Sequence, residues 1–158
     1  MEEIRHLVIG MGQIGRPIFN ILRPYNVEAF DIEGYRWPKG SFSVLNICFE
    51  YSLGFRDFVV SYQREFLNQG GLTIIHSTVP LGTSRQLNAV HSPIRGQHNR
   101  LEEGVRTFVK FFGGERASEA AEYFRRLGIK VMLFDDPETT EAMKLWDTEK
   151  YRNDIEFA

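Results

Sequence analysis

Short apolar or β-branched runs alternate along this chain with stretches whose apolar positions recur at helical spacing. The runs expected to form strands are residues 6–9, 27–32, 43–49, 72–76, 89–91, 107–112 and 130–134. Between the first two, Ile14, Ile18 and Ile21 fall on one face of a helix. This alternation is typical of βαβ units. It predicts an α/β fold of the three-layer Rossmann-like kind, with a doubly wound, mainly parallel sheet.

Several residues mark where the expected helices begin and end. Gly70-Gly71 is expected to stop the helix whose apolar stripe begins at Phe55, and Gly128 is suited to a left-handed residue after a helix. Asp136-Pro137 is a good start for a final helix over residues 137–150. Residues 92–106 give no clear pattern and are expected to be irregular.

These limits predict how the chain is organised. We expect residues 1–136 to form the Rossmann domain, and residues 137–158 to be a trailing C-terminal helix packed on it. The whole is then a single domain.

Composition limits the class of protein. With 158 residues, 42% of them hydrophobic, the chain can bury one core without staples. A net charge of −2 argues against a nucleic-acid partner. One cysteine, Cys48, cannot form an internal disulfide or a metal cluster. With no signal peptide and no long apolar span, we expect a cytoplasmic protein without a membrane partner.

The clearest chemical motif is a glycine loop between the first strand and the first helix. Gly10-Met-Gly12-Gln-Ile-Gly15 matches G-x-G-x-x-G. In this motif the first glycine makes a tight turn, the second lets the backbone approach a diphosphate, and the third lets helix and strand pack closely. The N–H groups of the helix N-terminus then favour negative charge. The loop therefore predicts a dinucleotide cofactor.

An acidic residue supports this interpretation. Asp31 stands at the end of the second predicted strand, 21 residues after Gly10, where a carboxylate can accept hydrogen bonds from ribose hydroxyls. It would repel a 2′-phosphate, so NAD is favoured over NADP, although Arg36 keeps NADP open. In the alternative interpretation the glycines serve only packing and Asp31 caps a loop. The residues expected to bind the cofactor are Gly10, Met11, Gly12, Gln13, Ile14, Gly15, Asp31, Ser77 and Thr78.

Further motifs extend the pattern over about residues 5–148. They are the turn Ser77-Thr-Val-Pro-Leu-Gly-Thr83, the pair Ser92-Pro93, the segment Phe112-Gly-Gly114 and the helical segment Glu141-Ala-Met-Lys144. Together with the glycine loop and Asp31, they resemble the N-terminal NAD-binding domain of the UDP-glucose/GDP-mannose (nucleotide-sugar) dehydrogenase family.

The resemblance implies oxidation of a sugar C6 alcohol to a carboxylate, with a cysteine thiolate as nucleophile and Thr78 and Lys144 as catalytic residues. Two positions depart from the family pattern: Ile94 replaces a glutamate and Thr148 replaces an asparagine. The family's cysteine lies in a C-terminal substrate domain, which we do not expect to find within these 158 residues. Cys48 lies in an apolar run without a neighbouring positive charge, so we expect it to be buried and not nucleophilic.

Some of these residues have a simpler structural interpretation. The Ser77 and Thr78 hydroxyls could cap the following helix instead of contacting the cofactor. Lys144 could be an ordinary solvated helix lysine. The stretch Arg85–Arg100 contains no acidic residue and could hold a substrate phosphate, but an ordinary polar loop is favoured. Its two histidines do not make a metal site. Glu50 and Tyr51 are bulkier than the residues that the family has beside the cofactor.

These patterns lead to one main functional hypothesis and two alternatives. The chain is expected to be the NAD(H)-binding half of a nucleotide-sugar dehydrogenase, either truncated or completed by a substrate-domain chain, and unable to oxidise a sugar alone. Alternatively it is a non-catalytic NAD-binding or interaction module whose trailing helix, with Trp146 and Tyr151, makes a homodimer or packs on another partner. A small NAD-linked dehydrogenase of the 6-phosphogluconate or prephenate type is the third possibility.

Overall fold

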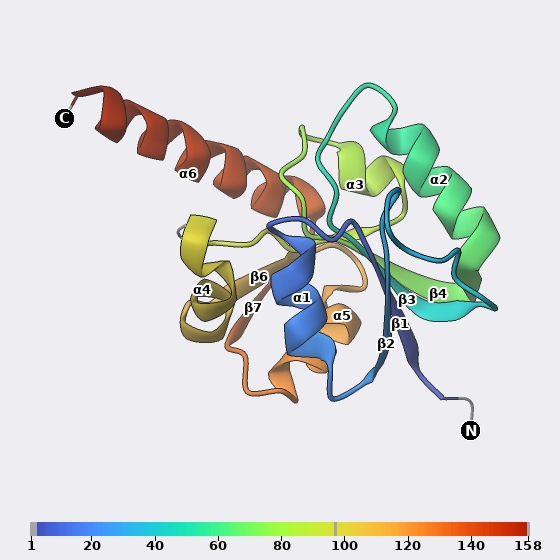
Figure 1. The fold of residues 1–158 in the computed structure, drawn as a ribbon. Coiled ribbons are helices and arrows are strands. Elements are labelled where there is room, and N and C mark those ends of the chain that lie inside the picture. The colour runs from blue at the N-terminus through green and yellow to red at the C-terminus, as the bar shows by residue number, and fades with distance from the viewer. Residues whose placement is uncertain (1–2, 97, 158) are drawn as a thin grey trace.

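The computed structural model of the chain, which describes residues 3–96 and 98–157, is built around a twisted sheet (Figure 1). The seven strands of this sheet lie in the order β2-β1-β3-β4-β5-β6-β7. They are β1 (Arg5–Ile9), β2 (Asn26–Phe30), β3 (Phe42–Ile47), β4 (Leu67–Ile75), β5 (Val90–His91), β6 (Lys110–Gly113) and β7 (Val131–Phe134). All neighbouring pairs are parallel except β5 and β6, which are antiparallel. The predicted Rossmann-like, mainly parallel α/β fold is confirmed.

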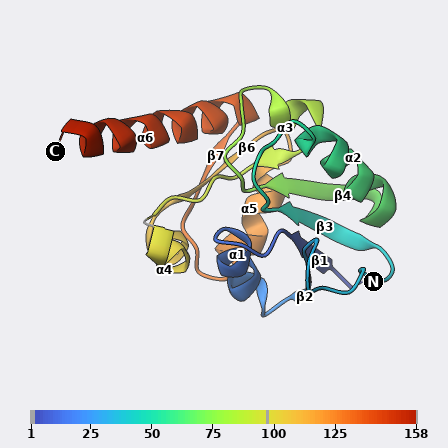
Figure 2. The same ribbon diagram turned by 45° about the horizontal axis from the view of Figure 1, so that its top comes forward.

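Helices cover both faces of the sheet, so the molecule has three layers (Figure 2). One face carries α1 (Gly15–Leu22), α4 (Leu101–Thr107) and α5 (Ala117–Arg125). The other carries α2 (Phe55–Phe66), the short α3 (Thr83–Gln86) and the first turns of α6 (Pro137–Phe157). A 3₁₀ turn, η1 (His98–Arg100), leads into α4.

The core is divided between the two faces because successive side chains of a strand point to opposite sides. In β1, Val8 packs toward α1 and α5, whereas Leu7 and Ile9 pack toward α2. All three are essentially fully buried. The central strands are therefore apolar on both sides, as parallel sheets require, and their polar carboxyl-terminal ends are left to form a site.

The helix α2 ends earlier than the sequence predicts. Its last residue is Phe66, and β4 already begins at Leu67, where it pairs with Phe42. The register then jumps to a pairing of Val44 with Leu72. Gly70, whose φ is +75°, lies in this irregularity. The glycine pair thus does not stop the helix; it lets β4 bulge before its core segment.

The segment between β5 and β6 is more regular than predicted. The helix α4 occupies residues expected to be irregular, and β6 begins at Lys110 instead of residue 107. At Gly104 a Cβ atom would lie 2.5 Å from the Arg95 carbonyl oxygen. Glycine at this helical position therefore lets α4 pack closely against the loop after β5. Because glycine has a low helix propensity, it also weakens the sequence pattern from which α4 could have been predicted.

The C-terminal region follows the prediction at its start and exceeds it in length. Asp136 Oδ1 accepts a 2.8 Å hydrogen bond from the Thr139 amide, so it caps α6 as expected. Gly128 has a φ of +87°, as a left-handed residue after α5 should. The last helix runs to Phe157 instead of ending near residue 150. The division into residues 1–136 and 137–158 stays a prediction. Within the described residues, no helix combines the length and apolar character needed to cross a membrane.

Candidate functional site

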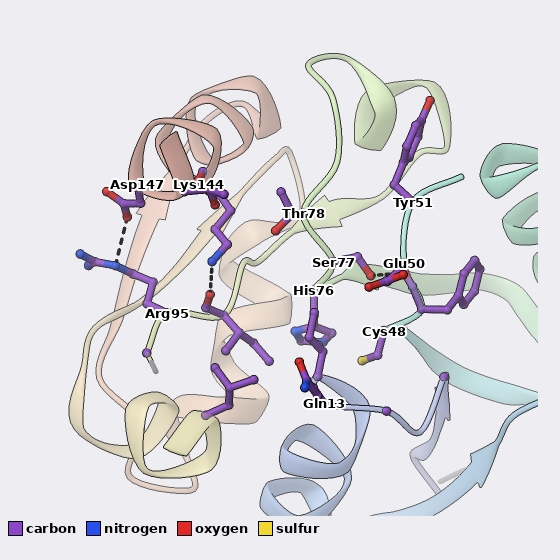
Figure 3. A pocket seen from close by; sticks show the side chains of 18 of the residues that line it. Gln13, Cys48, Glu50, Tyr51, His76, Ser77, Thr78, Arg95, Lys144 and Asp147 are labelled. Carbon is purple, nitrogen blue, oxygen red and sulfur yellow. Dashed lines mark hydrogen bonds and ion pairs between the residues drawn. The ribbon is translucent and has the colours of Figure 1, made fainter. Parts of the chain in front are cut away.

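A cavity of about 960 Å³ opens above the carboxyl ends of the central strands (Figure 3). Its walls come from the loop after β1, the ends of β2, β3 and β4, the loop after β5, and helices α4 and α6. The lining residues are Gly10, Gly12, Gln13, Ile14, Asp31, Cys48, Phe49, Glu50, Tyr51, His76, Ser77, Thr78, Ile94, Arg95, Gly96, Leu101, Phe108, Lys144, Asp147 and Thr148. Ligands of open α/β sheets bind at this edge. Most of the predicted site residues are thus brought together in one cavity.

The three glycines of the loop have distinct surroundings. At Gly15 a Cβ atom would lie 1.5 Å from the Gly10 carbonyl oxygen, so any side chain is excluded by backbone. Gly10 has a φ of +96°, and a Cβ there would meet the Phe49 amide nitrogen at 2.6 Å. At Gly12 no atom lies within 4 Å of the Cβ position. The predicted packing role of Gly15 is confirmed, and Gly12 leaves its backbone open toward the cavity.

The Asp31 carboxylate is tied to the glycine loop. Its Oδ2 accepts a 2.7 Å hydrogen bond from the Met11 amide, and its Oδ1 accepts one of 2.7 Å from the Ile32 amide. Since Asp31 also lines the cavity, the carboxylate is held at the cavity wall beside the loop. Met11 itself does not line the cavity; its contribution is the amide that orients Asp31.

The turn after β4 is fixed by residues from distant parts of the chain. Ser77 Oγ donates a 2.6 Å hydrogen bond to the Phe49 carbonyl oxygen, joining the ends of β4 and β3. The side chain of Glu141, in α6, accepts hydrogen bonds from the amides of Gly82 (2.9 Å) and Ser84 (3.0 Å). The interpretation of Ser77 as a helix cap is therefore wrong, because Glu141 satisfies the start of α3. Thr78 is half-buried and faces the cavity.

At the other end of the cavity, Lys144 is held by the loop after β5. Its Nζ donates a 2.9 Å hydrogen bond to the Ile94 carbonyl oxygen, and burial lowers its pKa. Arg95 forms a 3.5 Å ion pair with Asp147 nearby. The interpretation of Lys144 as an ordinary solvated helix lysine is wrong. It is a half-buried amine at the cavity wall, where it can meet a polar ligand.

The described residues of the stretch Arg85–Arg100 do not form one basic cluster. His91 is fully buried: its Nε2 donates a 3.0 Å hydrogen bond to the Ser77 carbonyl oxygen, and its Nδ1 accepts one of 2.8 Å from Thr140 Oγ1. Burial lowers the pKa of His91 to about 4, so the ring is neutral. Arg85 instead pairs with Glu138. Among the described residues, no group of histidine, cysteine or carboxylate side chains is arranged to hold a metal ion.

Cys48 is buried, as predicted, and lines the cavity with 5% of its surface exposed. Burial raises the pKa of its thiol far above the usual range. The expectation that no positive charge lies near this thiol is wrong, because Lys110 from β6 acts on it across the sheet. That charge offsets only part of the burial effect, so the thiol remains protonated.

His76 and Lys110 are among the residues of the site region that were not predicted from the sequence. His76 lines the cavity from the end of β4, and its Nδ1 lies 3.1 Å from Lys110 Nζ beneath it. A lysine within the apolar run of residues 107–112 is a signal that could have been followed, since charged residues are almost never fully buried without a partner.

Comparison with known proteins finds this fold in several solved structures. No family model matches the sequence, and no curated protein matches it. A UDP-D-ManNAc dehydrogenase from Pyrococcus horikoshii superposes with a TM-score of 0.78 over 91% of this chain, at 20% identity. The UDP-N-acetyl-mannosamine dehydrogenase of Staphylococcus aureus gives a TM-score of 0.74 over 94%, at 18% identity. A reductive aminase from Aspergillus terreus, solved with NADPH, gives 0.70 over 96%, at 11% identity.

These similarities concern only part of the other proteins. The matched region covers 50%, 51% and 62% of the three chains, respectively. This chain therefore spans between about half and three-fifths of the length of these proteins, with the architecture that they share. At identities this low, the comparison shows the fold.

Proposed function

We propose that this chain binds a nicotinamide dinucleotide, as the cofactor-binding half of an oxidoreductase similar to the nucleotide-sugar dehydrogenases. The observation that carries the proposal is the arrangement of Gly12 and Asp31 on one cavity wall: an unobstructed backbone at a helix N-terminus beside a carboxylate fixed by the same loop. The loop supplies amides for a diphosphate, and the carboxylate supplies an acceptor for ribose hydroxyls. The similar proteins in the solved structures are dehydrogenases and an NADPH-bound aminase, which supports this cofactor class.

Within that class we propose NAD as the preferred cofactor. Both Asp31 oxygens accept hydrogen bonds from backbone amides, so the side chain presents negative charge where a 2′-phosphate would have to fit. Arg36, the residue that would favour NADP, is exposed and does not line the cavity.

Calorimetric titration with NADH tests the proposal. We expect saturable binding, weakened about tenfold by Asp31→Ala, because a charge-assisted hydrogen bond contributes about 1.4 kcal/mol. Asp31→Asn retains an oxygen for the Met11 amide and removes the charge, so it should narrow the preference for NADH over NADPH. Glu33→Ala, an exposed carboxylate two residues away, is the matched control and should leave affinity unchanged. No heat with millimolar NAD or NADH would refute cofactor binding.

We further propose that Thr78 and Lys144 form the catalytic side of the cavity, and that the chain alone does not oxidise a nucleotide sugar. The Cys48 thiol is protonated and buried, which is unsuited to a nucleophile. The buried Ile94 stands where the nucleotide-sugar dehydrogenases, which this chain resembles, have a glutamate. The Lys144 amine donates a hydrogen bond to the carbonyl oxygen of Ile94. A substrate-domain chain would have to supply the missing nucleophile.

An NADH absorbance assay with UDP- and GDP-sugars should therefore show no steady turnover. Turnover by this chain alone would contradict the proposal. A second candidate function, a non-catalytic NAD-binding module, is favoured by the same departures and by the exposed Trp146 on α6, a helix that extends past the sheet (Figure 2). We propose that this helix packs on a second copy or on the substrate-domain chain. The Tyr151 side chain, named with Trp146 for this role, lies outside the described residues.

A further inference from the structure

A row of four polar side chains crosses the sheet on the face covered by α1 and α5. It runs from Lys110 on β6 to His76, which directly follows β4, then to Asn46 on β3 and finally to His6 on β1. The distances are 3.1 Å from Lys110 Nζ to His76 Nδ1, 2.9 Å from His76 Nε2 to Asn46 Oδ1, and 3.3 Å from Asn46 Nδ2 to His6 Nδ1. All four side chains are buried.

The lysine sets the direction of this row. A lysine ammonium only donates hydrogen bonds, so His76 Nδ1 must accept and its Nε2 must carry the hydrogen. That hydrogen is donated to Asn46 Oδ1, and Asn46 in turn donates to His6 Nδ1. Lys110 Nζ also donates a 2.9 Å hydrogen bond to the Ser92 carbonyl oxygen. Every partner thus fits a protonated Lys110.

Nothing in the described part of the chain balances the charge of that amine. Its hydrogen-bond partners are an imidazole and a carbonyl, and neither is a carboxylate. The rings of Phe112 and Phe124, centred 5.5 and 5.6 Å from Nζ, offer only weak attraction. The titratable groups that act on Lys110 or on its partner His76 from the other elements are those of Cys48, His91, Lys144 and His6.

A buried cation without a counter-ion is costly, and the usual response is loss of its proton. Burial accordingly lowers the pKa of Lys110 to about 7. It also lowers the pKa of His6 to about 4 and that of His76 well below its ordinary value. In the neutral range, Lys110 is the member of the row that changes charge.

This amine lies one side chain below the cavity floor. His76 and Cys48 line the cavity together with Gly12 and Gln13, at the N-terminus of α1. In Figure 3 the His76 ring lies between Gln13 and the Ser77–Thr78 segment. An anion bound at the glycine loop would therefore face the row from the solvent side, and would supply the negative charge that the fold lacks.

We propose that the diphosphate of the bound dinucleotide is the counter-ion of Lys110, acting electrostatically across the His76 ring, whose two nitrogens stay bonded within the row, so that cofactor binding is coupled to proton uptake by this buried amine. The inference rests on the proposed dinucleotide site, and it adds Lys110, a charged residue of β6, to the residues that set the affinity of that site. A bound anion stabilises the protonated amine, so the pKa of Lys110 is higher in the complex than in the free chain. By linkage, the affinity for the dinucleotide is greatest below the pKa that Lys110 has in the free chain. It falls as the pH rises from that value toward the pKa that Lys110 has in the complex.

Calorimetry of NADH binding in buffers of different ionisation heat, such as Hepes and Tris, measures the proton directly. At pH 7.5 the free amine is largely deprotonated, and we expect uptake of at least about half a proton. The dissociation constant should rise about tenfold between pH 7 and pH 8.5. Lys110→Met should remove both effects, and Lys130→Met, at an exposed lysine, should leave both intact.

The outcomes separate this inference from the function on which it rests. Binding whose heat is independent of the buffer, in the unmodified chain, would overturn the coupling and leave the dinucleotide site standing. Uptake that persists in a folded Lys110→Met chain would assign the proton to another group and also overturn it. No NADH binding at any pH would remove the proposed function and this inference together. The measurement on the unmodified chain decides the matter even if Lys110→Met does not fold.

Discussion

Gly15→Ala should lower the free energy of unfolding by at least about 3 kcal/mol. The added methyl group would stand 1.5 Å from the Gly10 carbonyl oxygen, and that atom belongs to the backbone that joins β1 to α1. No rotamer change can relieve this overlap, so α1 would have to move away from the sheet. Since domains are stable by only about 5–15 kcal/mol, the loss should be plain in urea-induced unfolding followed by circular dichroism.

Gly12→Ala is the matched control for this substitution. It adds the same methyl group to the same loop, at a position with no atom within 4 Å. Unfolding should therefore change by no more than about 0.5 kcal/mol. Under the proposed function, the methyl group would instead obstruct a diphosphate, and NADH binding should weaken at least about tenfold. Equal stability losses for the two variants would contradict the assignment of Gly15 to packing and Gly12 to ligand approach.

Glu141→Ala should be the second strongly destabilising change, at about 2–4 kcal/mol. The Glu141 carboxylate is fully buried and receives the amides of Gly82 and Ser84. Each buried amide left without an acceptor costs about 1–3 kcal/mol. We expect the loss to appear in urea-induced unfolding, together with faster amide exchange over residues 82–87.

The control for this prediction lies one turn earlier in α6. Glu138 is a partly exposed carboxylate that pairs with Arg85, and exposed ion pairs contribute about 0–1 kcal/mol. Glu138→Ala should therefore change the free energy of unfolding by less than about 1 kcal/mol. A similar cost for both variants would show that Glu141 is an ordinary surface carboxylate in solution, and not the cap of α3.

The predictable parts of the fold are those encoded by nearby residues. The strand at residues 6–9 and the stripe of Ile18 and Ile21 are local patterns, and the structure places both as expected. The helix α4 was missed because Gly104, which its packing requires, weakens the local signal. The early end of α2 was missed because a glycine pair suits a bulged strand as well as a helix end.

The same contrast applies to the candidate site. The glycine loop and Asp31 could be found because their spacing along one βαβ unit is itself the signal. The position of Lys144 could not be predicted from the sequence, since its contact with Ile94 joins segments that lie 50 residues apart. The capping of α3 by Glu141 could not be predicted either, because hydroxyl groups of the nearby Ser77–Thr83 turn could also have capped this helix.

By itself, the sequence determined the parallel α/β architecture, the open backbone at Gly12 and the carboxylate that follows β2, because strand alternation, glycine freedom and helix periodicity act over a few residues. The tertiary structure alone decided that Lys110, His76 and Cys48 meet beneath one cavity. Their meeting depends on the order in which β3, β4 and β6 lie in the sheet, and the pKa of each group depends on burial that only the packed helices create.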